Sequence, residues 1–151
     1  MCQQLSDPFL WKKEKWVYLL ADDVYSLFDP EQYGLTPTAP HTACRKGFVI
    51  QFRVTKKQLY LDRLQVCCAN NDYPPINGIQ AVRGDGNMHV YNDLDTKLSY
   101  SGVIIIGKDI KSEYKGRYGT WPHFFAATYN LTFSDGRLVK VKNTSGQYFG
   151  I

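Results

Sequence analysis

The chain has 151 residues, of which 44% are hydrophobic and 21% are charged. A chain of this length forms one domain and buries about 70% of the surface that it exposes when unfolded. These proportions exclude a wholly disordered protein. The formal net charge is +4 and the pI is about 8.8, below the level typical of nucleic-acid-binding domains. The charge thus permits an anionic partner without requiring one.

The cysteines and the N-terminus indicate a cytoplasmic protein. Cysteines stand at positions 2, 44, 67 and 68, and no CxxC motif occurs. This spacing does not predict a zinc site, and we expect reduced thiols. Residues 1–8 lack the basic and apolar regions of a signal peptide, and apolar runs such as Val103–Ile106 are too short to span a membrane. We therefore expect a cytoplasmic protein without a membrane segment, metal or cofactor.

The N-terminal third predicts a strand, a short helix and a loop. Residues 15–20 favour a strand by their aromatic and branched content. Asp22 or Asp23 can cap a helix over 24–28, which Pro30 ends. Residues 31–42 have no periodicity and contain Gly and Pro, so they predict a loop.

A regular β pattern begins at Phe48. Alternation over 48–54, a turn at 55–58 and a second apolar run over 59–66 predict an antiparallel hairpin. Asn77–Gly78 is a two-residue hairpin turn signal.

The C-terminal half continues this pattern. A strand is expected over 88–91, and residues 98–107 predict a central strand covered on both faces, with a bulge or close backbone approach at Gly102. Residues 125–133 and 138–142 form the clearest hairpin, in which we expect Val139 and Val141 to point inward. The sequence thus predicts an all-β, mainly antiparallel domain, a sandwich or small barrel of about seven to eight strands with one or two short helices.

The segment Pro40–Phe52 contains a thiol close to cations. His41, Arg45 and Lys46 could lower the pKa of Cys44 and make it a nucleophile. The alternative is that Cys44 is a small buried residue at a strand entry. We favour this alternative, with His41 and Arg45 forming a ligand-facing rim.

A second candidate is the basic, aromatic stretch 108–123. Cations interleaved with rings can bind phosphates and stack on bases, but the same composition describes an exposed loop, and Asp109 and Glu113 weaken the positive field. We favour the loop over a protein or ligand contact, and either over nucleic acid. The candidate binding residues here are Lys111, Tyr114, Lys115, Arg117, Tyr118 and Trp121.

Two further constellations involve histidines. Asp85, Asn87 and His89 alternate and could hold a divalent ion on a strand, but the neighbouring glycines equally predict a turn, which we favour. A metal-independent nuclease would need two converging groups, and His41 and His123 are the pair to test.

The motif His41-Thr42-Ala43-Cys44-Arg45-Lys46-Gly47-Phe48, followed by Leu59-Tyr60-Leu61 and Tyr100-Ser101-Gly102, resembles a group of small bacterial proteins of no known activity. The resemblance covers about a sixth of the chain. It implies a bacterial cytosolic protein with one all-β domain, and it implies no catalytic residues.

The sequence predicts a binding protein. No P-loop, dinucleotide, HExxH, GxSxG or EF-hand signature occurs, and the 11 Tyr, 8 Phe and 3 Trp are typical interface residues. We expect a non-enzymatic bacterial protein that binds another protein, as an immunity or defence-related accessory. The alternatives are a small nuclease-like hydrolase that clamps phosphate with Lys and Arg, and a β-barrel that binds a small molecule.

Overall fold

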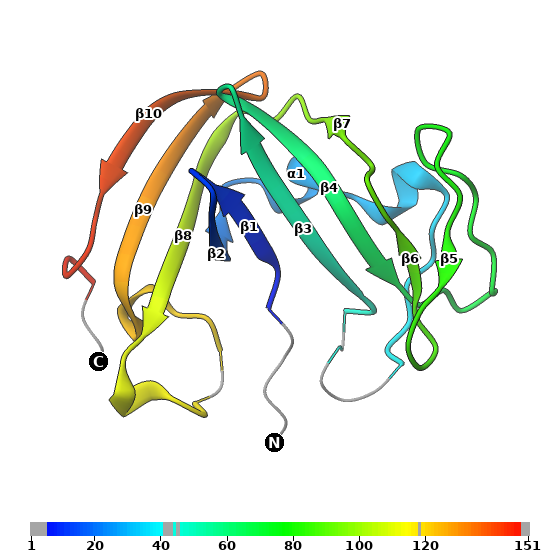
Figure 1. Cartoon of the computed structure of the whole chain (residues 1–151), viewed down its shortest axis with the longest axis horizontal. Helices are drawn as coiled ribbons and strands as arrows, with labels where there is room; N and C mark the ends of the chain where they lie inside the picture. Colours follow the sequence, from blue (N-terminus) through cyan, green and yellow to red (C-terminus); the bar gives the residue numbers. More distant parts are fainter. Residues whose placement is uncertain (1–5, 41–43, 45, 118, 149–151) are drawn as a thin grey trace.

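The computed structural model describes residues 6–40, 44, 46–117 and 119–148. Within them, ten strands form one sheet, and short helical segments lie in the connections (Figure 1). The strands are β1 (Pro8–Trp11), β2 (Glu14–Ala21), β3 (Phe48–Thr55), β4 (Gln58–Val66), β5 (Val82–Arg83), β6 (His89–Tyr91), β7 (Thr96–Lys97), β8 (Gly102–Ile110), β9 (Phe125–Ser134) and β10 (Arg137–Asn143). The helical segments are α1 (Val24–Leu27) and the 3₁₀ helices η1 (Pro30–Tyr33), η2 (Ser112–Tyr114) and η3 (Pro122–Phe124).

The strand order is β10-β9-β8-β2-β1-β3-β4-β6-β5, with β7 on β4. Every pairing is antiparallel except that of β1 with β3. The sheet curves until β10 meets β4, where Arg137 pairs with Gln58. Leu59 N–H donates to Gly136 O at 2.9 Å and Leu138 N–H to Lys57 O at 2.7 Å. Figure 1 shows the two halves meeting at this junction and diverging below it. The all-β prediction is confirmed.

The core lies on the concave face of the sheet. Alternate side chains point inward, so Ile50 and Phe52 of β3 face Leu61 and Leu64 of β4. Ile104 and Ile106 of β8, with Leu131 and Phe133 of β9, supply the other half. The same cluster includes three buried side chains from the end of α1 and the segment that follows it: Leu27, Phe28 and Leu35. The segment from α1 through η1 therefore covers part of the concave face.

Two hairpin turns place lysines in the left-handed region. Lys12 and Lys13 join β1 to β2 with φ of 53° and 62°, and Lys56 and Lys57 join β3 to β4 with φ of 50° and 65°. Two successive positive φ values match the twist of antiparallel strands. The turn at Asn77–Gly78 also forms, but only a single bridge, Ile76 to Ile79, flanks it.

Several sequence predictions need correction around α1 and β8. Asp23 takes the N-cap position, but its φ of 47° prevents side-chain capping, and Asp22 instead accepts a hydrogen bond from Val103 N–H at 3.1 Å. Residues 30–33 form η1 inside the expected loop. The central strand begins at Gly102 rather than at residue 98. The close approach expected at Gly102 is observed, because a Cβ atom there would lie 2.5 Å from the Tyr100 hydroxyl.

The faces of β10 are also reversed from the prediction. Leu138 is buried, while Val139 and Val141 are 59% and 45% exposed. The cause is an irregularity in register between Leu138 and Lys140, which a simple alternation does not anticipate.

In the described residues we find no helix with the length and apolar character needed to cross a membrane.

Candidate functional site

A groove of about 600 Å³ lies between the α1–η1 segment and the start of β3. We call it the α1 groove. Its lining comes from two parts of the chain that are distant in sequence, and the second part includes the residues leading into β3. The lining residues are Val24, Tyr25, Phe28, Asp29, Pro30, Glu31, Pro37, Lys46 and Phe48.

The α1 groove continues inward as a small apolar recess of about 100 Å³. Val24, Phe28, Lys46 and Phe48 line both spaces, so they form the passage between them. Beyond them the recess is walled by core side chains of α1, β2 and β3 and by Asp7: Tyr18, Leu27, Ile50 and Phe52. A recess of this kind accepts an apolar side chain or a comparable group.

The recess ends at a buried carboxylate. Asp7 is only 6% exposed. It accepts a hydrogen bond from Ile50 N–H at 2.9 Å and forms an ion pair with Lys46 Nζ. Tyr18 lies beside it, and burial, reinforced by the negative charge of Asp7, raises the pKa of Tyr18 to about 12. Tyr18 is therefore a neutral phenol at physiological pH, and the recess has a polar end in which the charge of Asp7 is balanced by Lys46.

Aromatic rings pack against one another in the wall of the α1 groove. Phe28 stacks on Tyr33 with ring centroids 5.5 Å apart and packs at 5.3 Å against Phe48. At the rim the pattern is different, because Val24 is 52% exposed and Tyr25 is 76% exposed. Two adjacent large apolar side chains beside a preformed groove are typical of a contact surface.

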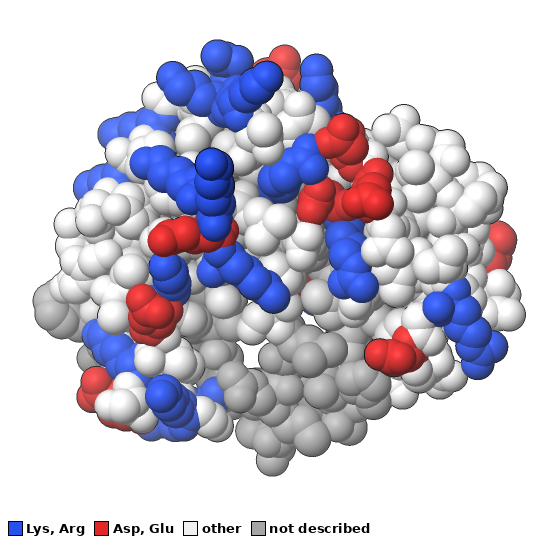
Figure 2. Space-filling model, in the orientation of Figure 1, with Lys and Arg blue, Asp and Glu red and all other residues white. Residues whose placement is uncertain are grey.

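The charge around the α1 groove is opposite to that of the whole protein. Residues 16–44 contain four carboxylates, Asp22, Asp23, Asp29 and Glu31, and no Lys or Arg. Lys46, the cation in the lining, is paired with Asp7. Lys and Arg side chains gather elsewhere, over the upper left of the face shown in Figure 2, where β8, β9, β10 and the β3–β4 turn lie. The rim of the groove therefore favours a basic partner.

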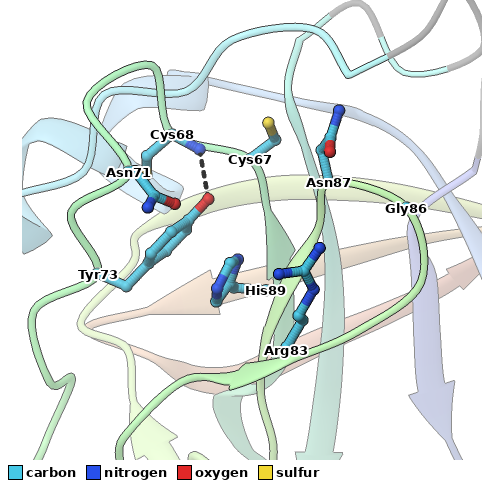
Figure 3. Close-up of a pocket in the computed structure, with 8 residues that line it drawn as sticks. All are labelled: Cys67, Cys68, Asn71, Tyr73, Arg83, Gly86, Asn87 and His89. Carbon is cyan, nitrogen blue, oxygen red and sulfur yellow. Dashed lines mark hydrogen bonds between the residues drawn. The ribbon is translucent and has the colours of Figure 1, made fainter.

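A second pocket, of about 300 Å³, lies beside the C-terminal end of β4 (Figure 3). We call it the Arg83 pocket. β5 and β6 form a hairpin in which Arg83 is directly opposite His89, and His89 pairs with Val66 of β4. The turn between these strands supplies Gly86 and Asn87, and the residues after β4 supply Cys67, Cys68, Asn71 and Tyr73.

One wall of the Arg83 pocket is an aromatic stack. The His89 and Tyr73 rings are 3.9 Å apart and nearly parallel. The Tyr73 hydroxyl accepts a hydrogen bond from Cys68 N–H at 2.9 Å, and burial raises the pKa of Tyr73. Figure 3 shows the Arg83 guanidinium on the side of His89 away from Tyr73, directed toward Cys67 and Asn87.

The predicted site around Cys44 is only partly described. His41, Arg45 and Tyr118 lie outside the described residues. Cys44 is 2% exposed and packs with Cys67 and Met88, and burial raises the pKa of its thiol. A raised pKa opposes nucleophilic chemistry, because the thiolate is the reactive form. Lys46, which the sequence suggested as an activator of this thiol, forms its ion pair with Asp7.

The predicted basic and aromatic stretch separates into two kinds of residue. Tyr114 stacks on Phe124 at 4.5 Å, and His123 meets the edge of both rings, so these side chains belong to a small cluster on the convex face of the sheet. Lys115, Arg117 and Trp121 are exposed, and Lys111 is half-buried. Residues 108–110 belong to β8 rather than to a loop.

The turn favoured for this stretch is observed, and Asp85, Asn87 and His89 do not share a strand face. Asp85 and Asn87 belong to the turn before β6, and only His89 is in the strand. Within the described ranges, no three His, Cys, Asp or Glu side chains converge as metal ligands.

No family model matches the chain, and no curated protein or solved structure is significantly similar to it. The resemblance of the His41–Phe48 motif to a bacterial group therefore adds nothing to the assignment of function, and the two pockets must be interpreted from their own chemistry.

Sequence reasoning missed both pockets. Val24, Tyr25 and Phe28 were identified only as a helix, and Arg83 was not singled out. The available signal for the α1 groove was the run from 16 to 44, which has four carboxylates and no Lys or Arg in a chain of net charge +4.

Proposed function

We propose that the protein binds another protein and that the α1 groove receives an apolar side chain of that partner. The observation that carries the proposal is the continuity between the exposed rim at Val24 and Tyr25 and the apolar recess behind Phe28 and Phe48. Interfaces gain most of their free energy from a few large side chains that enter such recesses.

The shape of the recess restricts the anchor. About 100 Å³ bounded by Leu27, Ile50 and Phe52 matches one aliphatic or aromatic side chain. The polar end is occupied by Asp7 and Lys46, which form an ion pair, and Asp7 also accepts the hydrogen bond from Ile50 N–H. A charged anchor would find no free counter-ion there, so the anchor is apolar.

The charge at the rim specifies what flanks the anchor. Asp29 and Glu31 line the α1 groove, and Asp22 and Asp23 precede α1. Lys or Arg residues on either side of the anchor would therefore accelerate association and favour this face over the basic surface. The proposed partner motif is an apolar side chain between basic residues.

A bacterial source, an immunity-related role and the nuclease-like alternative stay predictions from the sequence. The proposal concerns only the mode of binding.

The experiment measures the affinity of short fluorescent peptides by anisotropy. The test peptide has a central Phe flanked by Lys, and the control peptides replace Phe by Ser or the lysines by Glu. We expect saturable binding of the test peptide only. Val24→Lys should weaken it by at least about tenfold, because it places a long charged side chain at the entrance of the recess.

Val139→Lys is the matched control, because Val139 is exposed to a similar degree on β10. It should leave the affinity unchanged. Glu31→Lys should weaken binding more at low than at high ionic strength, whereas Glu113→Lys, on η2, should not. Equal affinity for the Phe and Ser peptides, or equal loss in V24K and V139K, would overturn the proposal.

A further inference from the structure

The lining of the Arg83 pocket carries a cation without a counter-ion. Arg83 is exposed, and in the described part of the chain no carboxylate forms an ion pair with it. The remaining polar groups of the lining are the amides of Asn71 and Asn87, the His89 ring and the two thiols. None of these carries a fixed negative charge, so the pocket favours an anion.

His89 supplies a second, independent observation. Its Nδ1 is buried and has no hydrogen-bond partner among the described residues, a condition shared only with Trp16 Nε1. Buried polar atoms without partners are rare, because each costs about 1–3 kcal/mol, and such an atom requires an explanation. The His89 ring lines the pocket directly, so this unpartnered atom belongs to the wall of the pocket.

The turn that carries Asn87 leaves open space beside the pocket. Gly86 lies at the tip of the turn with φ of 61°, and a Cβ atom there would meet no other atom within 4 Å. The turn is closed by hydrogen bonds from Gly84 N–H to Met88 O at 2.9 Å and from Met88 N–H to Asp85 O at 3.2 Å. Asn87 is thus held on a defined turn at the end of the pocket toward which the Arg83 guanidinium is directed (Figure 3).

We propose that the Arg83 pocket binds the carboxylate or phosphate group of a small organic molecule. The guanidinium of Arg83 makes paired hydrogen bonds to two oxygens of the anion, and the side-chain amide of Asn87 donates a further one. The space of about 300 Å³ leaves room for an organic part beyond the anionic group. This site is separate from the α1 groove and does not depend on the function proposed for it.

The probe is phenyl phosphate, with phenol as the uncharged control, titrated into ¹⁵N-labelled protein and followed by NMR. We expect saturable shifts at the backbone amides of Gly86 and Asn87 and at the side-chain amide of Asn87, and no saturable shifts with phenol. Benzoate, tested in the same way, identifies which of the two anionic groups binds more tightly.

Arg83→Met should weaken phenyl phosphate binding by at least about tenfold, and Arg83→Lys should give an intermediate affinity, because it keeps the charge and loses the paired geometry. Arg137→Met is the control, because it removes an exposed arginine from β10, and it should bind as the wild type does. Unchanged affinity in R83M, saturable binding of phenol, or shifts centred away from residues 83–89 would overturn the proposal. Val24→Lys should leave this titration unchanged, which separates its outcome from that of the peptide experiment.

Discussion

Removal of the Asp7 carboxylate should destabilise the protein, and the structure divides the loss between a backbone hydrogen bond and an ion pair. Oδ1 accepts the Ile50 N–H at 2.9 Å, and Oδ2 pairs with Lys46. Asp7 is 6% exposed, so water cannot replace these contacts in the folded state. Asp7→Ala deletes both acceptors, whereas Asp7→Asn keeps a carbonyl oxygen for Ile50 and removes the charge.

The backbone hydrogen bond is the larger contribution. A hydrogen bond to a charged group contributes about 1.5–3 kcal/mol. The side chain of Lys46 is 41% exposed, and solvent screening reduces its ion pair to about 1 kcal/mol or less. We therefore expect Asp7→Ala to lower the free energy of unfolding by about 2–4 kcal/mol and Asp7→Asn by about 1–2 kcal/mol.

Urea denaturation followed by tryptophan fluorescence measures both values. Glu113→Gln, which alters an exposed carboxylate on η2, is the control and should change stability by less than about 0.5 kcal/mol. If Asp7→Asn costs as much as Asp7→Ala, the backbone bond is not the main contribution. If neither variant differs from the wild type, the buried carboxylate does not stabilise the fold and the reasoning fails.

Three further predictions concern the fold. Gly136→Ala should destabilise by about 2–4 kcal/mol, since φ is +82° and the new Cβ would lie 1.9 Å from Leu98 O, whereas Gly146→Ala, at φ of +76° with open space around it, should cost about 1 kcal/mol in the same urea assay; equal costs would refute the steric argument. Burial raises the pKa values of Tyr18, Tyr91 and Tyr100 to about 12. The unfolded chain, in which tyrosine ionises near pH 10, releases these protons first, so urea midpoints should fall as pH rises from 10 toward 12; a constant midpoint over this range would contradict the burial of the phenols. Cys44→Ser should cost about 1–3 kcal/mol by placing a hydroxyl in a sulfur-rich apolar cluster. In a Cys2→Ser background, Cys44→Ser should not change the number of thiols that react rapidly with a thiol reagent. Loss of one rapidly reacting thiol would show that Cys44 is reactive.

The hairpins could be predicted because their signals are local. In β3–β4 and β9–β10, alternation and turn residues lie within a single stretch of sequence, and the structure confirms both pairs. The expectation of about seven or eight strands was too low, because β5 and β7 are two residues each and are held by pairing with β6 and β4 rather than by a pattern of their own.

The candidate sites could not be predicted, since they depend on contacts between distant segments. Lys46 was recognised as a cation near Cys44, but only the fold places it against Asp7, 39 positions away. Similarly, Phe28 and Phe48 become the wall of one groove only when α1 folds over β3. Arg83 and His89 are six positions apart, but their common role requires the register of the β5–β6 hairpin.

The claim that the α1 groove is a docking site is tested most directly by locating the bound peptide. The measurement is a methyl-labelled NMR titration with the Lys-flanked Phe peptide. We predict that the methyl groups of Val24, Leu27 and Ile50, which line the recess, shift in a saturable manner, while those of Val139 and Val141 on β10 do not. Saturable shifts on β10 alone, or none at Val24, Leu27 and Ile50, would contradict the proposed function.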